Sequence, residues 1–165
     1  MSEIFIRTVK PGDFVRVLEL NRAEVAQTSA MSQSRLVQLD HLSDYHKVAV
    51  IDGQIAGFLM AMCYGTPYAN VNFQWFSDRR KDFVYIDRVV VDGAFAGRGV
   101  GSALYQDLSD FARRIDITSL ACEINAEPPN PASMAFHQKW GFKEIGSESR
   151  DEGQRRVVMM MAELN

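Results

Sequence analysis

Cysteine, histidine and long apolar runs are all scarce in this chain of 165 residues. The two cysteines, Cys63 and Cys122, form no Cys-x-x-Cys pair, and the three histidines are not clustered. We therefore expect no metal site and no redox pair, and we expect both thiols to be buried. No stretch approaches the roughly 18 consecutive apolar residues of a membrane helix, and the first residues lack the apolar centre of a signal peptide. These absences predict a cytoplasmic protein without a membrane partner.

The net charge is also small. Eighteen basic and 21 acidic residues leave a net charge of −3, and the two signs are interleaved along the chain. Nucleic acid or an anionic membrane requires a concentrated positive field, so neither partner is expected. Apolar residues make up 47% of the sequence, which is enough for the core of one domain covering residues 1–165.

A glycine-rich turn between a strand and a helix organises the chain. Residues 84–91 form an apolar, β-branched run of strand length, and residues 100–115 repeat apolar side chains at helical spacing. The turn that joins them, and that runs into the start of the second segment, reads Ala96-Gly97-Arg98-Gly99-Val100-Gly101-Ser102. A helix N-terminus has unpaired backbone N–H groups and a positive dipole end, and glycine leaves room for an anion. We therefore expect a phosphate-bearing ligand at this turn.

Three kinds of glycine loop compete for that position. A Walker loop requires a Gly-Lys pair, and the chain has none. The dinucleotide fingerprint G-x-G-x-x-G matches Gly97 and Gly99 but meets Ser102 at its third glycine, although Glu123 imitates its ribose-binding acid. The pattern [QR]-x-x-G-x-[GA] matches Gly99 and Gly101, with Ala96 in place of Gln or Arg.

A second block favours the last pattern. Residues 130–142 read Asn-Pro-Ala-Ser-Met-Ala-Phe-His-Gln-Lys-Trp-Gly-Phe, in which Asn130 suits a helix N-cap and Gly141 a left-handed stop. Together the two blocks resemble the GNAT superfamily of acyl-CoA-dependent N-acetyltransferases, closely over residues 84–145 and loosely elsewhere. The resemblance implies an α+β fold with a mixed, mostly antiparallel sheet of about seven strands, helices on both faces and splayed central strands.

The resemblance also implies acetyl-CoA as the cofactor. Its pyrophosphate would lie on the backbone N–H groups of residues 98–102, and its pantetheine arm beside the block that begins at Asn130. A free backbone N–H of the splayed strand would stabilise the oxyanion of the reaction. The residues expected to contact the cofactor are Val89, Val90, Val91, Ala96, Gly97, Arg98, Gly99, Val100, Gly101, Ser102, Asn125, Asn130, Ser133, Phe136 and His137.

Direct acetyl transfer to an amine requires a base, because an alkyl ammonium with a pKa of about 10.4 is almost fully protonated at neutral pH. Asp87 and Glu123 are the candidates, since each is an acidic residue inside an apolar run, where burial raises the pKa of a carboxyl group. For Asp87 the structural alternative is an ion pair with an arginine such as Arg88. His137 stands where the superfamily commonly has a Tyr general acid, so it is the third catalytic candidate, with packing as its alternative.

Other segments supply the remaining elements. Helical spacing marks a first helix from Phe14 to Val25 and a second from Leu36 to Leu42. Residues 64–82 are expected to be a long, aromatic-rich loop that forms a substrate wall, a partner surface or a simple cover for the core. Further strands are expected at residues 4–9, 46–51, 54–63, 118–125, 143–146 and 156–164, with Asp52-Gly53 as a hairpin turn.

The acceptor is expected to meet the first helix, the long loop and the central strand. For Asn21, which lies on an apolar helix stripe, a buried hydrogen-bonding role is the alternative. The expected substrate residues are Asn21, Glu24, Trp75, Phe76 and Tyr85.

Three functions follow from these patterns. The first is an acetyl-CoA-dependent N-acetyltransferase that transfers acetyl from the thioester to a primary amine of a small molecule or a peptide N-terminus. The second is a catalytically idle acyl-CoA-binding module that senses or regulates, which the departures at Ala96 and His137 favour. The third is a nucleotide-binding domain built on residues 97–101. The acceptor, the acyl chain and the oligomeric state, a homodimer included, stay open.

Overall fold

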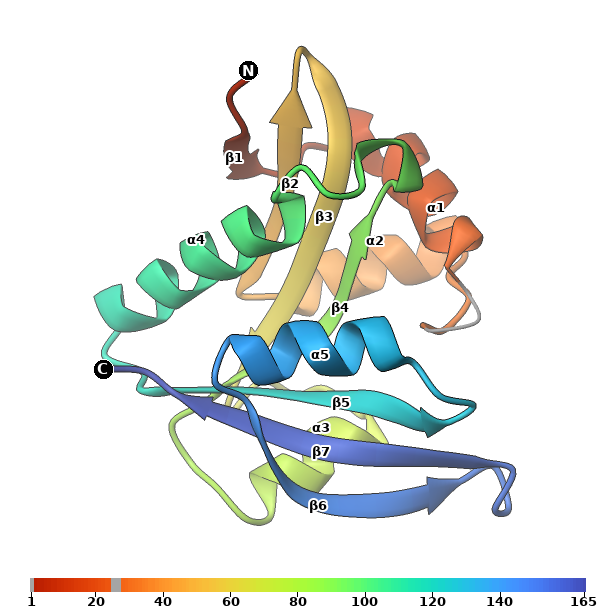
Figure 1. The fold of residues 1–165 in the computed structure, drawn as a ribbon, viewed down its shortest axis with the longest axis vertical. Coiled ribbons are helices and arrows are strands. Elements are labelled where there is room, and N and C mark those ends of the chain that lie inside the picture. Colours follow the sequence, from red (N-terminus) through yellow and green to blue (C-terminus); the bar gives the residue numbers. More distant parts are fainter. Residues whose placement is uncertain (1, 25–27) are drawn as a thin grey trace.

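The computed structural model describes residues 2–24 and 28–165 (Figure 1). Val25, which helical spacing assigns to the first helix, lies outside the described residues. The strands are β1 (Phe5–Thr8), β2 (Tyr45–Ile51), β3 (Gln54–Cys63), β4 (Val84–Val91), β5 (Ser119–Glu127), β6 (Lys143–Arg150) and β7 (Arg155–Glu163). The helices are α1 (Phe14–Ala23), α2 (Gln33–Leu42), α3 (Val71–Ser77), α4 (Val100–Arg114) and α5 (Pro131–Lys139), with 3-10 turns at Pro11–Asp13 and Gly93–Phe95. Of the helices described, none has the length and apolar character needed to cross a membrane.

Within the described residues, seven strands form one mixed sheet in the order β1-β2-β3-β4-β5-β7-β6. Neighbouring strands are antiparallel except β4 and β5, which are parallel. This parallel pair is joined only at Val84↔Leu120 and Tyr85↔Ala121, after which the two strands diverge. Figure 1 shows the result, with β5, β6 and β7 lying across the direction of β2, β3 and β4. The expected α+β fold with splayed central strands is confirmed.

Helices cover both faces of this sheet. One face, called here the α4 face, packs against α4 and α5, and its core includes Leu104 together with Cys122 and Ile124 of β5. The opposite face, called the α1–α3 face, packs against α1, α2 and α3, and its core includes Ala121 of β5. Successive residues of a strand point to opposite faces, so Glu123 projects from the α1–α3 face.

Two segments differ from the sequence-based expectation. The region expected to be a loop contains α3, because Asn70 caps it: the Asn70 side-chain oxygen accepts hydrogen bonds from the backbone N–H groups of Asn72 and Phe73, each at 3.0 Å. The last hairpin is longer than expected, because β6 continues to pair with β7 as far as Arg150. Its turn therefore comprises residues 151–154 alone. Cys122 is buried as expected, whereas Cys63 is only partly buried.

Candidate active site

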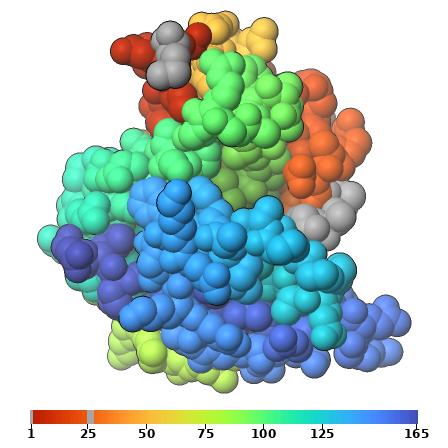
Figure 2. Space-filling view, viewed as in Figure 1, coloured from red at the N-terminus to blue at the C-terminus, as the bar shows by residue number. Residues whose placement is uncertain are grey.

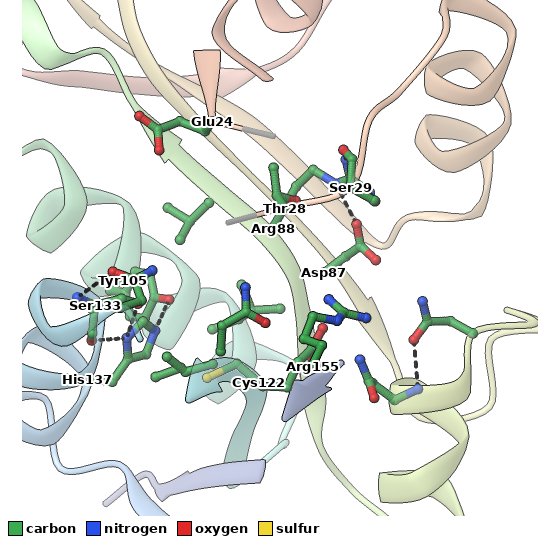
Figure 3. Close-up of a pocket in the computed structure, with 18 residues that line it drawn as sticks. Glu24, Thr28, Ser29, Asp87, Arg88, Tyr105, Cys122, Ser133, His137 and Arg155 are labelled. Carbon is green, nitrogen blue, oxygen red and sulfur yellow. Dashed lines mark hydrogen bonds and ion pairs between the residues drawn. The ribbon is translucent and has the colours of Figure 1, made fainter. Parts of the chain in front are cut away.

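A cavity of about 300 Å³ opens where β4 and β5 diverge (Figure 3). Residues from both faces of the sheet line it, and in Figure 2 the surface is hollowed between α5, α1 and the segment before α4. The wall on the α4 face consists of Tyr105, Asn130, Ser133 and His137. The wall on the α1–α3 face consists of Glu24, Thr28, Ser29, Asn70 and Asn72. The strands add Ile86, Asp87, Arg88, Val89, Cys122, Glu123, Ile124, Asn125 and Arg155.

Glu123 lies in the gap between the diverging strands and is partly buried. The Tyr85 hydroxyl donates a hydrogen bond of 2.6 Å to its carboxylate Oε2. Burial raises the pKa of Glu123 to about 7; the negative charge of Asp87 adds to the rise, and the hydrogen bond from Tyr85 opposes it. A carboxyl group that is about half ionised near neutral pH is well placed to take a proton from an ammonium group.

Asp87 and Arg88 form a buried ion pair, with Arg88 Nε 2.7 Å from Asp87 Oδ2. A β-bulge explains how two consecutive residues share one face: Met60 pairs with Arg88 and Ala61 with Ile86, so Asp87 has no partner on β3. The Tyr68 hydroxyl donates to the other Asp87 oxygen. Both carboxylate oxygens are therefore engaged, which favours the structural ion pair over the expected role of Asp87 as a base.

His137 is held in one protonation state by its neighbours. Its Nδ1 lies 2.7 Å from the Ser133 carbonyl oxygen, which can only accept, so Nδ1 carries the proton. Its Nε2 therefore accepts the hydrogen bond from the Tyr105 hydroxyl, at 2.5 Å. Burial lowers the pKa of His137, which keeps the ring neutral at neutral pH. With no proton on Nε2, this arrangement favours the packing alternative, and the general-acid role of His137 stays a prediction.

The glycine turn before α4 has the shape that a phosphate requires. Gly97 and Gly99 adopt φ values of +76° and +80°, and a Cβ atom built on either would meet no atom of the described residues within 4 Å. Gly99 is the N-cap of α4 and supplies no side-chain cap, so the N–H groups of the first turn are left for a ligand. Ala96 and Arg98 in the preceding loop and Ser102 in the first turn of α4 are exposed.

The two sequence blocks meet in space. A Cβ atom on Gly101 would lie 3.5 Å from the Phe136 ring, so the α4 N-terminus packs directly on α5. Asn130 Oδ1 accepts a hydrogen bond from the Ser133 backbone N–H at 3.4 Å, which confirms the expected N-cap. Asn130 and Ser133 line the cavity, and the glycine turn, which does not line it, adjoins the same helix through the contact of Gly101 with Phe136.

The three expected valines of β4 take different positions. Val89 lines the cavity, and beyond Tyr85 no strand of the described residues pairs with the β5-facing edge of β4. Val91 packs against the core of the α4 face. The Val90 side chain is buried in the core of the opposite face, so only its backbone is available to a cofactor. Val100 is likewise buried, so only its backbone would be available to a phosphate.

Of the expected acceptor residues, Glu24 lines the cavity, whereas Asn21 and Tyr85 do not. The Asn21 amide donates to the Ser29 carbonyl at 3.0 Å and accepts from Arg88 at 3.1 Å. Asn21 is therefore a buried hydrogen-bonding residue, its structural alternative. Tyr85 is fully buried and reaches the cavity only through its hydrogen bond to Glu123.

Trp75 and Phe76 were expected to form a substrate wall, and the structure contradicts this. Phe76 is fully buried in the core of the α1–α3 face, because α3 turns it inward against the sheet. The Trp75 ring packs on Gly146 of β6, where a Cβ atom would lie 2.6 Å from it, and its Nε1 donates to Glu148 at 2.8 Å. Both aromatic residues therefore hold α3 against the sheet through packing contacts, and Trp75 adds a hydrogen bond.

Several cavity residues have no signature in the sequence. Tyr105 follows the apolar stripe of α4, and a phenol on a buried helix face is a weak sign that its hydroxyl has a partner. Asn72 and Arg155 line the cavity from segments whose patterns carry no chemistry, and Tyr68, outside the lining, donates to Asp87. The packing of α3 on the sheet places Asn72, and the pairing of β5 with β7 places Arg155.

Solved structures share this architecture. Ard1 from Thermoplasma volcanium superposes with a TM-score of 0.80 at 19% identity, covering 98% of each chain. The ribosomal-protein-S18-alanine N-acetyltransferase from Escherichia coli gives a TM-score of 0.74 at 15% identity, covering 99% of this chain and 95% of the other. The yncA protein of Salmonella typhimurium, solved with its cofactor acetyl-CoA, gives a TM-score of 0.74 at 20% identity, covering the same shares. At these identities the likeness establishes the fold.

The sequence itself identifies the family. Comparison with curated proteins finds no match. The model of the Acetyltransferase (GNAT) family, however, matches residues 14–142, which is most of the chain and includes both the glycine turn and the Asn130 block. With its splayed sheet and open glycine turn, this chain belongs to the GNAT acetyltransferase family.

Proposed function

We propose that this chain is an acetyl-CoA-dependent N-acetyltransferase that transfers acetyl directly from the thioester to a primary amine of a small molecule or a peptide N-terminus. The observation that carries the proposal is Glu123, a partly buried carboxyl group with a pKa of about 7 at the gap in the sheet. Membership of the GNAT family and the acetyl-CoA bound to the yncA protein support the choice of cofactor.

The residues of the α4 face fit acetyl-CoA. The open glycine turn and the free N–H groups at the start of α4 suit the pyrophosphate. Asn130 and Ser133 line the adjoining side of the cavity and would hold the pantetheine arm. The unpaired edge of β4 at Val89 offers backbone groups to the acyl end. When bound, acetyl-CoA supplies an acetyl group activated as a thioester.

The sheet divides the two reactants. Apart from Val90 and Asn125, whose side chains share the face of Glu123, the residues expected to hold the cofactor lie on the α4 face or in the turn before α4. Glu123 projects from the α1–α3 face, so the amine would approach from that side. The walls there carry Glu24, Thr28, Ser29 and Asn72, which suit a polar acceptor. Glu123 removes the ammonium proton and thereby creates the nucleophile. The CoA thiol has a pKa of about 8.5, so it leaves as a thiolate without a proton from His137.

A thiol-release assay with acetyl-CoA over a panel of amines tests the proposal. We expect at least one amine to release CoA and Glu123→Gln to suppress that release. The acyl-CoA-binding module remains a second candidate, since Nε2 of His137 has no proton to give and Ala96 departs from the family pattern. Calorimetric binding of acetyl-CoA with no accepted amine would favour that module, and binding of NADH in its place would favour the nucleotide-binding domain.

A further inference from the structure

Arg155 is a cation in the cavity that the proposed chemistry does not use. It is the first residue of β7, and its side chain lines the cavity (Figure 3). Its Nε lies 3.2 Å from Asp151 Oδ2 as an ion pair, but the guanidinium forms no hydrogen bond with the residues that the structure describes. The planar fork of its N–H donors therefore remains available, and a carboxylate matches that fork with two parallel hydrogen bonds.

Arg88 is the other arginine that lines the cavity, and its donors are already used. It donates to Asp87 at 2.7 Å and, at 3.1 Å each, to the Asn21 side chain and to the carbonyl and hydroxyl of Ser29. Arg88 thus holds β4 to the segment that follows α1. Of these two arginines, Arg155 is therefore the one whose guanidinium N–H groups are left for a ligand.

Strand register places Arg155 on the same side of the sheet as the base. Asn125 pairs with Val157 and Glu123 with Met159 on β7. Because side chains alternate along β7, Arg155 shares a face with Val157 and Met159, which is the face of Glu123. Arg155 lies four residues before Met159, the partner of Glu123, and four residues of strand span about 13 Å. The charged ends of Arg155 and Glu123 can approach each other more closely than their backbones do, because both side chains are long. The space between them suits a molecule whose amino and acidic groups are few bonds apart.

We infer that the acceptor is an amine that bears a carboxylate close to its amino group, of which an α-amino acid is the simplest case, and that Arg155 binds this carboxylate. The inference rests on the proposed function. The amino group faces Glu123 and the carboxylate faces Arg155, so each end of a zwitterion meets the opposite charge. Asp87 does not compete for the amino group, since Arg88 neutralises it.

Matched acceptors test this assignment. A series of L-amino acids is compared with their carboxamides, which keep the amine and the side chain but lack the negative charge. Each variant is compared with the unmodified protein on the same compound, so that differences in amine pKa cancel. We expect Arg155→Gln to lower kcat/KM roughly 10- to 100-fold on the amino acids, mainly through KM, and to leave the carboxamides nearly unchanged. Arg155→Lys, which keeps the charge without the fork, should fall between.

Arg156→Gln is the control, because it removes the same charge from the next residue, whose side chain is exposed. It should behave as the unmodified protein does, and thermal unfolding checks that each variant folds. Equal losses in both series for Arg155→Gln, or no loss in either series, overturn the inference and leave acetyl transfer standing. If acetyl-CoA binds but no amine of either series is acetylated, the proposed function fails and this inference with it.

Discussion

Replacing Glu123 with Gln removes the charge of this residue and preserves its shape. The amide still accepts the hydrogen bond from Tyr85 but cannot take a proton. With an accepted amine, kcat/KM should therefore fall by roughly 10²–10⁴. The acidic limb of the pH profile, expected near pH 7 from the pKa of Glu123, should disappear. Affinity for acetyl-CoA should persist, because its expected contacts lie mainly on the α4 face.

The same substitution should stabilise the protein at alkaline pH. The fold raises the pKa of Glu123 from 4.5 to about 7, so between these values the native protein keeps a proton that the unfolded chain has lost. Stability contributed by this proton falls as the pH rises through that window. The loss is at most about 3 kcal/mol, and cavity water lessens it because Glu123 is not fully enclosed. Glu123→Gln avoids the loss, so it should match the unmodified protein near pH 4.5 and exceed it above pH 7.

Urea unfolding at the two ends of this window measures the difference, since the midpoint and slope together give the free energy of unfolding. A stability gain that is the same at both pH values would show that the native pKa of Glu123 is not raised. A variant that keeps both the normal rate and the acidic limb would refute Glu123 as the base. In that case Glu24, which also lines the cavity, becomes the next residue to replace.

Three further substitutions separate binding, packing and chemistry. Asp87→Asn should destabilise the protein by about 3 kcal/mol in urea unfolding, because Arg88 is left without its buried counter-charge, and an intact fold with abolished turnover would contradict this. Gly99→Asp should weaken acetyl-CoA binding at least about tenfold in calorimetry relative to Gly99→Asn, because the added carboxylate repels a phosphate. Asn is the matched control, since it has the same size as Asp and the same tolerance of positive φ. Equal affinities would show that the phosphate does not bind at this turn. His137→Phe should cost about 1–3 kcal/mol of stability by stranding the Tyr105 hydroxyl, with little change in kcat; a fall in kcat at unchanged stability would restore the general-acid role.

Local signals in the sequence account for most of the fold. Asp52-Gly53 turns the β2–β3 hairpin with both residues at positive φ, and Asn130 caps α5 as its side chain predicts. The glycine turn lies at the start of α4 as expected, because Gly97 and Gly99 themselves supply the left-handed backbone that the turn needs. Each of these features depends on residues within a few positions of one another, which is why sequence reasoning finds them.

Features that depend on tertiary contacts escape such reasoning. Phe76 and Trp75 sit in an aromatic-rich stretch that could line a substrate or fill a core, and only the packing of α3 on the sheet decides for the core. Arg155 lies beside a polar turn, where arginines are usually solvated. Its place in the cavity follows from the β5–β7 register, which no local pattern contains.

Asp87 and Glu123 look alike in the sequence, since each interrupts an apolar strand. The bulge in β4 turns Asp87 to the same face as Arg88, and the two charges pair there. No such bulge separates Glu123 from its neighbours: Cys122 and Ile124 point to the α4 face, and the partner of Glu123 is the neutral hydroxyl of Tyr85. Burial is then not offset by a counter-charge, so the pKa of Glu123 rises. One extra residue in a strand therefore separates a carboxylate that supports the fold from one that is free to take a proton.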